Sequence, residues 1–166
     1  MQESSVVAFN QKSVDCGKSP KGYGRTYFAK HNFQRGDIII HGFGKIINHQ
    51  TSKISVQISL NKHYLPTKWS GRYWNHSCGP NCFIRTRSDG FPDLVALKDI
   101  NKGEEITYGY FMTEFSWSAR AQERRIVCRC GTKKCLKKIL SFSQLDYKHQ
   151  CDLKKRKIVS SYLYHL

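Results

Sequence analysis

Apolar residues in this 166-residue chain come in short runs, and turns interrupt them every few residues. A glycine turn at residues 22–24 precedes the run Arg25–Ala29, which has the composition of a strand. A second turn at 32–36 precedes the apolar run 37–40. Short strands between frequent turns favour small curved sheets and argue against a doubly wound α/β fold.

Further strands are predicted along the chain. Apolar residues alternate with polar ones over 54–59, which predicts a half-buried strand. The segments 45–48, 91–97 and 105–110 are also expected to be extended. Helical periodicity is weak, and it is found around 118–125 and in the C-terminal segment. The sequence therefore predicts a mainly β (α+β) protein.

Length and composition limit the possible classes. With 39% hydrophobic and 13% aromatic residues, the chain is too apolar to be disordered, and its length suits one domain. An uninterrupted apolar run of about 18 residues, which a membrane span needs, is absent from the sequence. Residues 1–8 are too polar for a secretory signal. We therefore expect a soluble intracellular protein without a membrane partner.

The charge of the chain is strongly positive. Its 28 Lys and Arg residues against 12 Asp and Glu give a formal net charge of +16, which attracts polyanions such as nucleic acid. Much of the excess lies late in the chain, and the run 154–157 suits a nuclear localisation signal or a phosphate-contacting arm. A solvated basic tail is the alternative interpretation.

Three of the seven cysteines form a C-x-C-x4-C cluster at Cys128, Cys130 and Cys135. Gly131 allows a sharp turn after the second thiol, so the three sulfurs can reach one tetrahedral zinc ion. Thiols packed as small hydrophobic groups are the alternative. The spacing leaves the fourth ligand open among the histidines and the remaining cysteines, which are Cys16, Cys78, Cys82 and Cys151.

Two other segments carry polar or aromatic groups in suggestive positions. The segment 72–82 (RYWNHSCGPNC) places donors and acceptors beside aromatic rings, which suits recognition of a heteroaromatic ring such as adenine. Taken alone, a histidine such as His76 is more often a hydrogen-bonded structural residue. Tyr108 and Tyr110 occupy one face of a predicted strand, where they form either a narrow channel or a core stripe. The pair Gly22 and Gly24 lacks the third glycine of a dinucleotide fingerprint.

Four segments in this order resemble the SET-domain family of protein lysine methyltransferases. They are KGYG, RYWNHSCGPNC, GEEITYGY and CRCGTKKC, and together they cover roughly residues 21–140. The last one is similar to the post-SET zinc segment of that family. The resemblance implies a SET-type fold of small curved sheets with a pseudoknot-like C-terminal threading and a zinc-bound post-SET appendage.

The resemblance also implies a division of the chain and an activity. The expected parts are a lead-in at 1–20, a catalytic domain at 21–112, a connector at 113–127, the post-SET segment at 128–140 and a basic tail at 141–166. The expected activity is methylation of a protein lysine, on a histone tail or another basic protein, with S-adenosylmethionine as the methyl donor.

Roles follow for the matching residues. The residues implied to hold S-adenosylmethionine are Lys21, Gly22, Tyr23, Gly24, Asn75 and His76. Tyr110 matches the catalytic tyrosine, and Tyr108 stands where Phe or Tyr limits the number of methyl groups added. A tyrosine at this position resembles mono- or limited methylation. The implied ligands of one structural Zn²⁺ are Cys78, Cys128, Cys130 and Cys135.

The chain departs from the family pattern at two places. Residues 41–45 lack the tyrosine that helps to line the lysine channel, and Gly109 stands where Asp is common. These departures, together with the charge, leave a non-catalytic, zinc-stapled module that binds chromatin or nucleic acid as the alternative function. A non-histone target such as a translation factor is a further alternative. The expected location is the nucleus in a eukaryote and the cytoplasm in a bacterium.

Overall fold

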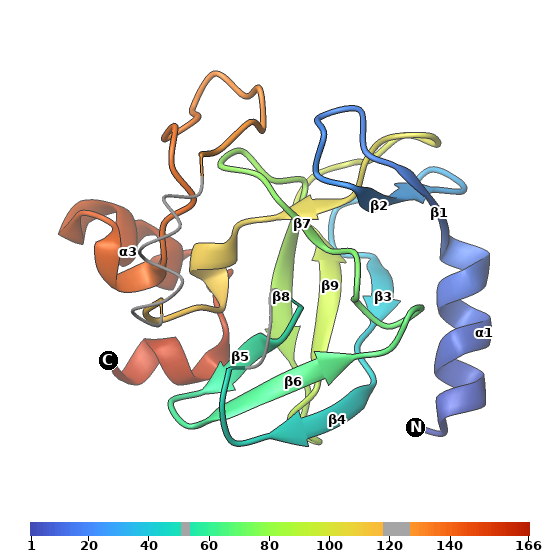
Figure 1. Ribbon diagram of the computed structural model, residues 1–166, viewed down its shortest axis with the longest axis horizontal. Helices are drawn as coiled ribbons and strands as arrows, with labels where there is room; N and C mark the ends of the chain where they lie inside the picture. Colours follow the sequence, from blue (N-terminus) through green and yellow to red (C-terminus); the bar gives the residue numbers. More distant parts are fainter. Residues whose placement is uncertain (51–53, 118–126) are drawn as a thin grey trace.

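The computed structural model describes residues 1–50, 54–117 and 127–166 (Figure 1). Its strands are β1 Val14–Lys18, β2 Arg25–Ala29, β3 Ile38–His41, β4 Gly44–Ile47, β5 Val56–Ser59, β6 Lys62–Pro66, β7 Asn75–His76, β8 Cys82–Thr86, β9 Pro92–Ala96 and β10 Thr107–Tyr108. Its α-helices are α1 Glu3–Ser13 and α3 Tyr147–Lys155. Its 3-10 helices are η1 Tyr110–Met112, η2 Phe142–Gln144 and η3 Ser161–His165.

The strands form four small sheets, as the sequence predicted. Two are three-stranded and antiparallel, in the orders β3-β9-β8 and β4-β6-β5. The sheet of β3, β9 and β8 crosses the middle of the molecule, and β4, β6 and β5 lie at one end of it (Figure 1). β1 and β2 form an antiparallel pair, whereas β7 and β10 pair in parallel. The mainly β fold class is therefore confirmed.

The central strand β9 is buried along its whole length. Leu94 is fully buried, and burying such a side chain stabilises a fold by about 1.5–3 kcal/mol. Asp93 is buried as well, and its carboxylate accepts hydrogen bonds from Arg87 Nη1 at 2.7 Å and from Arg85 Nη2 at 3.3 Å. The Nδ1 atom of His41 lies 2.8 Å from the same carboxylate. These partners offset the cost of burying a charge.

The structure corrects the expectation of a half-buried strand over 54–59. In β5, Val56, Gln57 and Ile58 are all buried. Gln57 tolerates burial because its side-chain oxygen accepts a hydrogen bond from Phe115 N at 2.8 Å and its Nε2 donates to Leu60 O at 3.2 Å. A polar residue with satisfied hydrogen bonds therefore breaks the rule that polar positions face water.

The N-terminal helix α1 was not predicted, because its sequence carries only a weak apolar face. One buried polar side chain fastens it to the core. Asn10 Nδ2 donates to His41 O at 2.8 Å and to Trp69 O at 2.6 Å. In Figure 1, α1 lies beside β1 and β3, so its position depends on tertiary contacts more than on its own pattern.

Residues 141–166, suggested by the sequence as a basic tail, are folded onto the core. Leu153, Ile158 and Leu163 from this segment are buried in the main apolar cluster. Ser160 N donates to Met112 O at 2.8 Å, which ties the segment to η1. The helix suggested around 118–125 lies outside the described residues. Within the described ranges, none of the helices has the length and apolar character needed to cross a membrane.

Candidate active site and metal centre

The parallel pairing of β7 with β10 joins two sequence motifs that lie about thirty residues apart. Asn75 is opposite Thr107, and His76 is opposite Tyr108. Asn81 reinforces the pair, because its Oδ1 accepts a hydrogen bond from Thr107 N at 2.9 Å. The NHSC and TYGY segments of the sequence are therefore adjacent in space.

Aromatic rings gather where these strands meet, and we call Trp74, His76, Tyr108 and Tyr110 the tyrosine cluster. The ring centroids of Tyr108 and Tyr110 are 5.3 Å apart, and those of Trp74 and Tyr108 are 5.9 Å apart. The Tyr110 hydroxyl donates to Trp74 O at 3.0 Å. Burial raises the pKa of both tyrosines well above the usual value, so both phenols stay neutral and act as hydrogen-bonding groups.

His76 connects the tyrosine cluster to the cysteines. Its Nδ1 accepts a hydrogen bond from Tyr110 N at 3.1 Å, and its Nε2 lies 3.3 Å from Cys78 Sγ. Burial lowers the pKa of His76 to about 4, so the ring is neutral. Because Nδ1 is the acceptor, Nε2 carries the proton and points it at the sulfur.

Four cysteine side chains converge beside His76, and we call Cys78, Cys128, Cys130 and Cys135 the cysteine cluster. Their sulfur atoms all lie within 4.8 Å of one another, and Cys78 and Cys128 are 3.6 Å apart. The four cysteines are free thiols. Four sulfurs at this separation suit the tetrahedral geometry of zinc, with Zn–S bonds of about 2.3 Å. Three other cysteines lie outside the cluster: Cys16, Cys82 and Cys151.

The chain around the sulfurs offers hydrogen bonds that favour thiolates. Leu136 N donates to Cys78 Sγ and Lys137 N to Cys135 Sγ, both at 3.4 Å. Burial opposes ionisation of Cys130, yet hydrogen bonds from Thr132 and the backbone outweigh it and lower the pKa to about 5. Burial raises the pKa of Cys78, so four thiolates here require a compensating cation.

The glycine loop at 21–24 is anchored at both ends. Tyr23 accepts a hydrogen bond from Arg129 N through its hydroxyl, which also lies 3.8 Å from Cys128 Sγ. Lys21 Nζ forms an ion pair with Glu105 at 2.9 Å. Gly22 has a φ of 76°, in the left-handed region that favours glycine. The loop therefore lies against the segment that carries the cysteine cluster.

Asn75 and His76 have side-chain partners within the protein. Asn75 Nδ2 donates to Arg25 O at 3.0 Å, next to the glycine loop, and the side chain is buried. This bond brings the predicted cofactor residues of 21–24 and of β7 to one region.

Thr113 and Glu114 belong to the same region, and sequence reasoning missed them. Glu114 is 3% exposed and follows η1 directly. Its neighbour Thr113 is fully buried and has its hydroxyl 3.5 Å from the Tyr108 hydroxyl. The sequence offered one weak signal of their importance: Glu114 is an acidic residue in an aromatic-rich segment, four positions after Tyr110.

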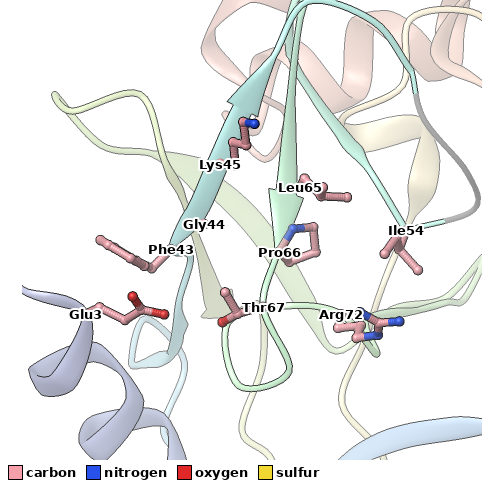
Figure 2. Close-up of a pocket in the computed structure, with 9 residues that line it drawn as sticks. All are labelled: Glu3, Phe43, Gly44, Lys45, Ile54, Leu65, Pro66, Thr67 and Arg72. Carbon is pink, nitrogen blue, oxygen red and sulfur yellow. The ribbon is translucent and has the colours of Figure 1, made fainter.

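The position of the missing channel tyrosine is closed by the backbone. A Cβ atom on Gly42 would lie 2.3 Å from Pro92 O, so this backbone excludes any side chain there. A pocket of about 440 Å³ lies nearby, beside the paired strands β4 and β6, and Glu3, Lys45 and Arg72 contribute charged groups to its wall (Figure 2). Its lining includes none of the tyrosine or cysteine cluster, so the chemistry suggested by the sequence lies elsewhere.

Comparison with known proteins gives consistent matches. The sequence model of the family described as "SET domain" matches residues 24–111. A histone-lysine N-methyltransferase of Neurospora crassa, named as H3 lysine-4 specific, is 30% identical over 159 residues. That match covers 81% of this chain and 12% of the relative. A Schizosaccharomyces pombe enzyme of the same name is 32% identical over 127 residues, covering 65% of this chain and 13% of the relative.

Two further similarities extend the comparison. The human histone-lysine N-methyltransferase 2B is 28% identical over 137 residues, covering 68% of this chain and 5% of that protein. A crystal structure of KRYPTONITE, in complex with mCHH DNA, H3(1-15) peptide and SAH, superposes with a TM-score of 0.61 at 21% identity. It matches 76% of this chain and 29% of that chain. The chain thus spans about an eighth of the length of the fungal relatives.

Proposed function

This chain belongs to the SET-domain family, and from that premise we propose that it transfers a methyl group from S-adenosylmethionine to a lysine side chain of a protein. One observation carries the proposal. The β7–β10 pair brings Asn75 and His76 against Tyr108 and Tyr110, so groups suited to a cofactor and groups suited to an amine share one place. The neighbouring cysteine cluster suits a structural zinc ion that supports them.

We infer that histone H3 is the first target to test. The fungal relatives are named H3 lysine-4 specific, and the matched crystal structure is described with an H3 peptide. An enzyme acting on a histone works in the nucleus, so nuclear location is part of the proposal. Because the chain spans a small share of those relatives, its own lysine and flanking residues are questions for experiment.

The residues around the glycine loop suit S-adenosylmethionine. The donor is a sulfonium cation, and the faces of aromatic rings attract such cations. Tyr110 also packs against the cysteine cluster, and its ring centroid is 6.4 Å from that of Trp117. Trp74 Nε1 is buried without a hydrogen-bond partner in the described part of the chain, which leaves a free donor beside the phenols. When bound, the cofactor supplies an electrophilic methyl group.

The protein's own contribution is to deliver a neutral amine in line with that methyl group. A lysine ammonium has no lone pair, and a buried apolar channel lowers its pKa and favours the neutral amine. The phenols of Tyr108 and Tyr110 are neutral at physiological pH, so they orient the amine through hydrogen bonds. Alignment of this kind supplies a large share of the rate gain. A tyrosine at 108 also crowds the space for additional methyl groups.

Zinc is proposed to be held by Cys78, Cys128, Cys130 and Cys135. Four thiolates leave no open coordination position, so its role is structural. It would join the loop after β7 to the segment 128–135 and so hold Tyr23 and His76 in place.

A second candidate role, contact with nucleic acid, is favoured by one patch of charge. Four lysines around the cysteine cluster are exposed: Lys133, Lys134, Lys137 and Lys138. Their positive charge suits a phosphate backbone, and each contact of this kind steepens the salt dependence of binding. Replacing all four lysines with Gln should weaken binding to a DNA duplex at low salt while methyl transfer to a peptide remains. Unchanged DNA binding would refute this role.

The methyltransferase proposal is tested by titrating the zinc-loaded protein with S-adenosylmethionine and then following labelled-methyl transfer to histone H3. Binding together with transfer that Tyr110→Phe removes would establish the activity. A folded, zinc-loaded protein that binds nucleic acid but never S-adenosylmethionine would contradict it and favour the non-catalytic module.

A further inference from the structure

A buried carboxyl group lies behind the tyrosine cluster, where neither the zinc site nor the glycine loop needs it. Glu114 is 3% exposed. Its Oε1 accepts a hydrogen bond from Gln57 N at 2.9 Å. Its Oε2 is buried and has no hydrogen-bond partner among the described residues. A buried carboxylate with half of its acceptor capacity unused is costly, so its presence requires an explanation.

The hydroxyl of Thr113 lies between the Tyr108 hydroxyl and the Glu114 carboxyl group. The hydroxyls of Tyr108 and Thr113 are 3.5 Å apart, and Thr113 Oγ1 lies 3.5 Å from Glu114 Oε1. The Thr113 hydroxyl has a second acceptor, Tyr110 O, at 3.3 Å. A single rotating hydroxyl is thus placed to accept from Tyr108 and to donate to Glu114. Both separations are longer than an ordinary O–H···O hydrogen bond, so a relay along them requires that they shorten when substrate binds.

The surroundings of Glu114 bring its pKa close to neutral pH. Burial raises its pKa to about 7, against the opposing hydrogen bonds from Gln57 and Thr113. The titratable groups that face it are phenols on three elements: Tyr108 on β10, Tyr110 on η1 and Tyr162 on η3. The negative charge of Glu114 raises the pKa of each, so these phenols do not compete with it as bases.

We propose that Tyr108, Thr113 and Glu114 form a proton relay that deprotonates the target lysine before methyl transfer. The proposal rests on the methyltransferase function. The ammonium N–H bond breaks as its proton passes to the Tyr108 oxygen, the Tyr108 proton passes to Thr113, and the Thr113 proton passes to the Glu114 carboxylate. The neutral amine then attacks the methyl carbon, and the C–S bond breaks to leave a neutral thioether. Thr113 and Glu114 act through Tyr108 and do not touch the substrate.

A purely structural role for Glu114 is the competing explanation. Its Oε1 and the side chain of Gln57 link β5 to the segment after η1. The two roles differ in one property, because a brace needs only an acceptor oxygen whereas a relay needs a group that ionises. Glu114→Gln keeps the acceptor and removes the ionisation.

The experiment compares four variants as zinc-loaded full chains: Glu114→Gln, Thr113→Val, Thr113→Ser and the control Asp152→Asn. Asp152 is exposed and pairs only with Arg156 among the described contacts. Transfer from S-adenosylmethionine to the H3(1-15) peptide is followed in single turnovers from pH 6 to 9. Cofactor affinity and the thermal midpoint are measured on the same samples.

The relay predicts that the wild-type rate rises with pH through about 7 and then levels. Glu114→Gln and Thr113→Val should lower the rate about 100-fold, the lower range for general acid–base catalysis, and remove the inflection. Their cofactor affinity should stay at the wild-type value and both variants should fold, with Glu114→Gln more stable than the wild type above pH 7 because it has no buried charge. Thr113→Ser, which keeps the hydroxyl, and Asp152→Asn should retain the wild-type profile. A Glu114→Gln or Thr113→Val variant with wild-type rate and inflection would overturn the relay.

A measurement without turnover separates this inference from the function on which it rests. The ¹³C shift of the Glu114 carboxyl is titrated with and without n-butylamine, in the presence of S-adenosylhomocysteine. A bound ammonium linked to the relay should lower the carboxyl pKa. Such a response without methyl transfer by the wild type would overturn the methyltransferase function and support the relay's link to an amine. Transfer by the wild type without such a response would overturn the relay alone.

Discussion

The tyrosine cluster and the cysteine cluster are neighbours, yet they are held in place by different forces. The first lies on and directly beside the paired strands β7 and β10, and buried hydrogen bonds such as that from Tyr110 to Trp74 O fix its rings. The second draws most of its members from the segment 128–136, and a few contacts join that segment to the rest of the protein, among them Arg129 N to the Tyr23 hydroxyl and Leu136 N to Cys78 Sγ. Packing maintains one cluster, and the proposed zinc ion would hold the other together.

The difference matches the different roles proposed for the two clusters. Catalytic groups need rotamers locked by packing, whereas a loop that closes over a cofactor has little core of its own. His76 contacts both regions, through Tyr110 N on one side and Cys78 Sγ on the other. A change at the cysteines is therefore expected to reach the tyrosines through this ring.

The largest expected effect comes from removing zinc. Structural zinc contributes about 10–16 kcal/mol in small zinc modules, and the cysteine cluster has little else to hold it. Chelation should abolish hydrogen-exchange protection over residues 127–140, while protection in β9 persists. Hydrogen exchange measured by mass spectrometry, before and after chelation, checks the outcome.

A matched pair of variants sharpens this result. Cys128→Ser should reproduce the effect of chelation, and Cys151→Ser, at an exposed cysteine outside the cluster, should not. Loss of protection in β9 together with 127–140 would mean that the two clusters form one cooperative unit, and the comparison would be wrong.

The second prediction concerns the hydroxyl of Tyr110. Tyr110→Phe should lower the rate of methyl transfer by at least about 100-fold, because misplaced reactants lose that much. It should also cost about 1–3 kcal/mol of stability, since Trp74 O loses its buried donor. Single-turnover transfer and urea unfolding measure the two effects.

Tyr147→Phe is the control, because Tyr147 is 81% exposed and lies outside both clusters. Cofactor affinity should be retained in both variants. We propose that the cysteine cluster holds the tyrosine cluster in place through His76. A Tyr110→Phe protein that also loses zinc affinity would show the opposite, that the tyrosine cluster supports the cysteine cluster.

The third prediction is a pH dependence of stability in the tyrosine region. Glu114 has a folded pKa of about 7 against an ordinary value of 4.5, so the folded state holds its proton more tightly. Its contribution is fully present below about pH 4.5 and is lost as pH rises through 7. The shift corresponds to about 3 kcal/mol at most. Glu114→Gln should therefore unfold at higher urea than the wild type at pH 8 and at a similar concentration at pH 4.5. Equal midpoints at both pH values would contradict the buried ionisation.

Much of the fold was predictable because its signals are local. Glycine turns and short apolar runs predicted β2, β3, β4 and β9, and the structure has these strands. Helix α1 was missed because Asn10 fastens it through contacts with residues 31 and 59 positions away. The folded segment 141–166 was missed for a similar reason. Its basic run suggested a solvated tail, whereas Leu153 and Leu163 on either side of that run are buried in the core.

The candidate site was predictable where residue type alone restricts the chemistry. Cysteine spacing and the NHSC and TYGY motifs identified groups that the structure brings together. Their roles stay predictions until they are tested. Glu114 was not predictable, because one carboxyl acquires meaning only from burial beside the hydroxyls of Tyr108 and Thr113.

The smallest expected effect concerns the rigidity of the backbone at Gly42, which directly follows β3. At Gly42, an added Cβ would lie 2.3 Å from Pro92 O, a contact with backbone that cannot rotate away. Gly42→Ala should therefore lower the free energy of unfolding by about 1–3 kcal/mol, the usual cost of overpacking. Zinc affinity should be unchanged, because the cysteine cluster is held independently. Urea unfolding and a competition assay with a zinc chelator measure the two quantities. If the larger substitution Gly42→Tyr unfolds at the wild-type midpoint, the backbone after β3 is mobile and packing alone does not fix it.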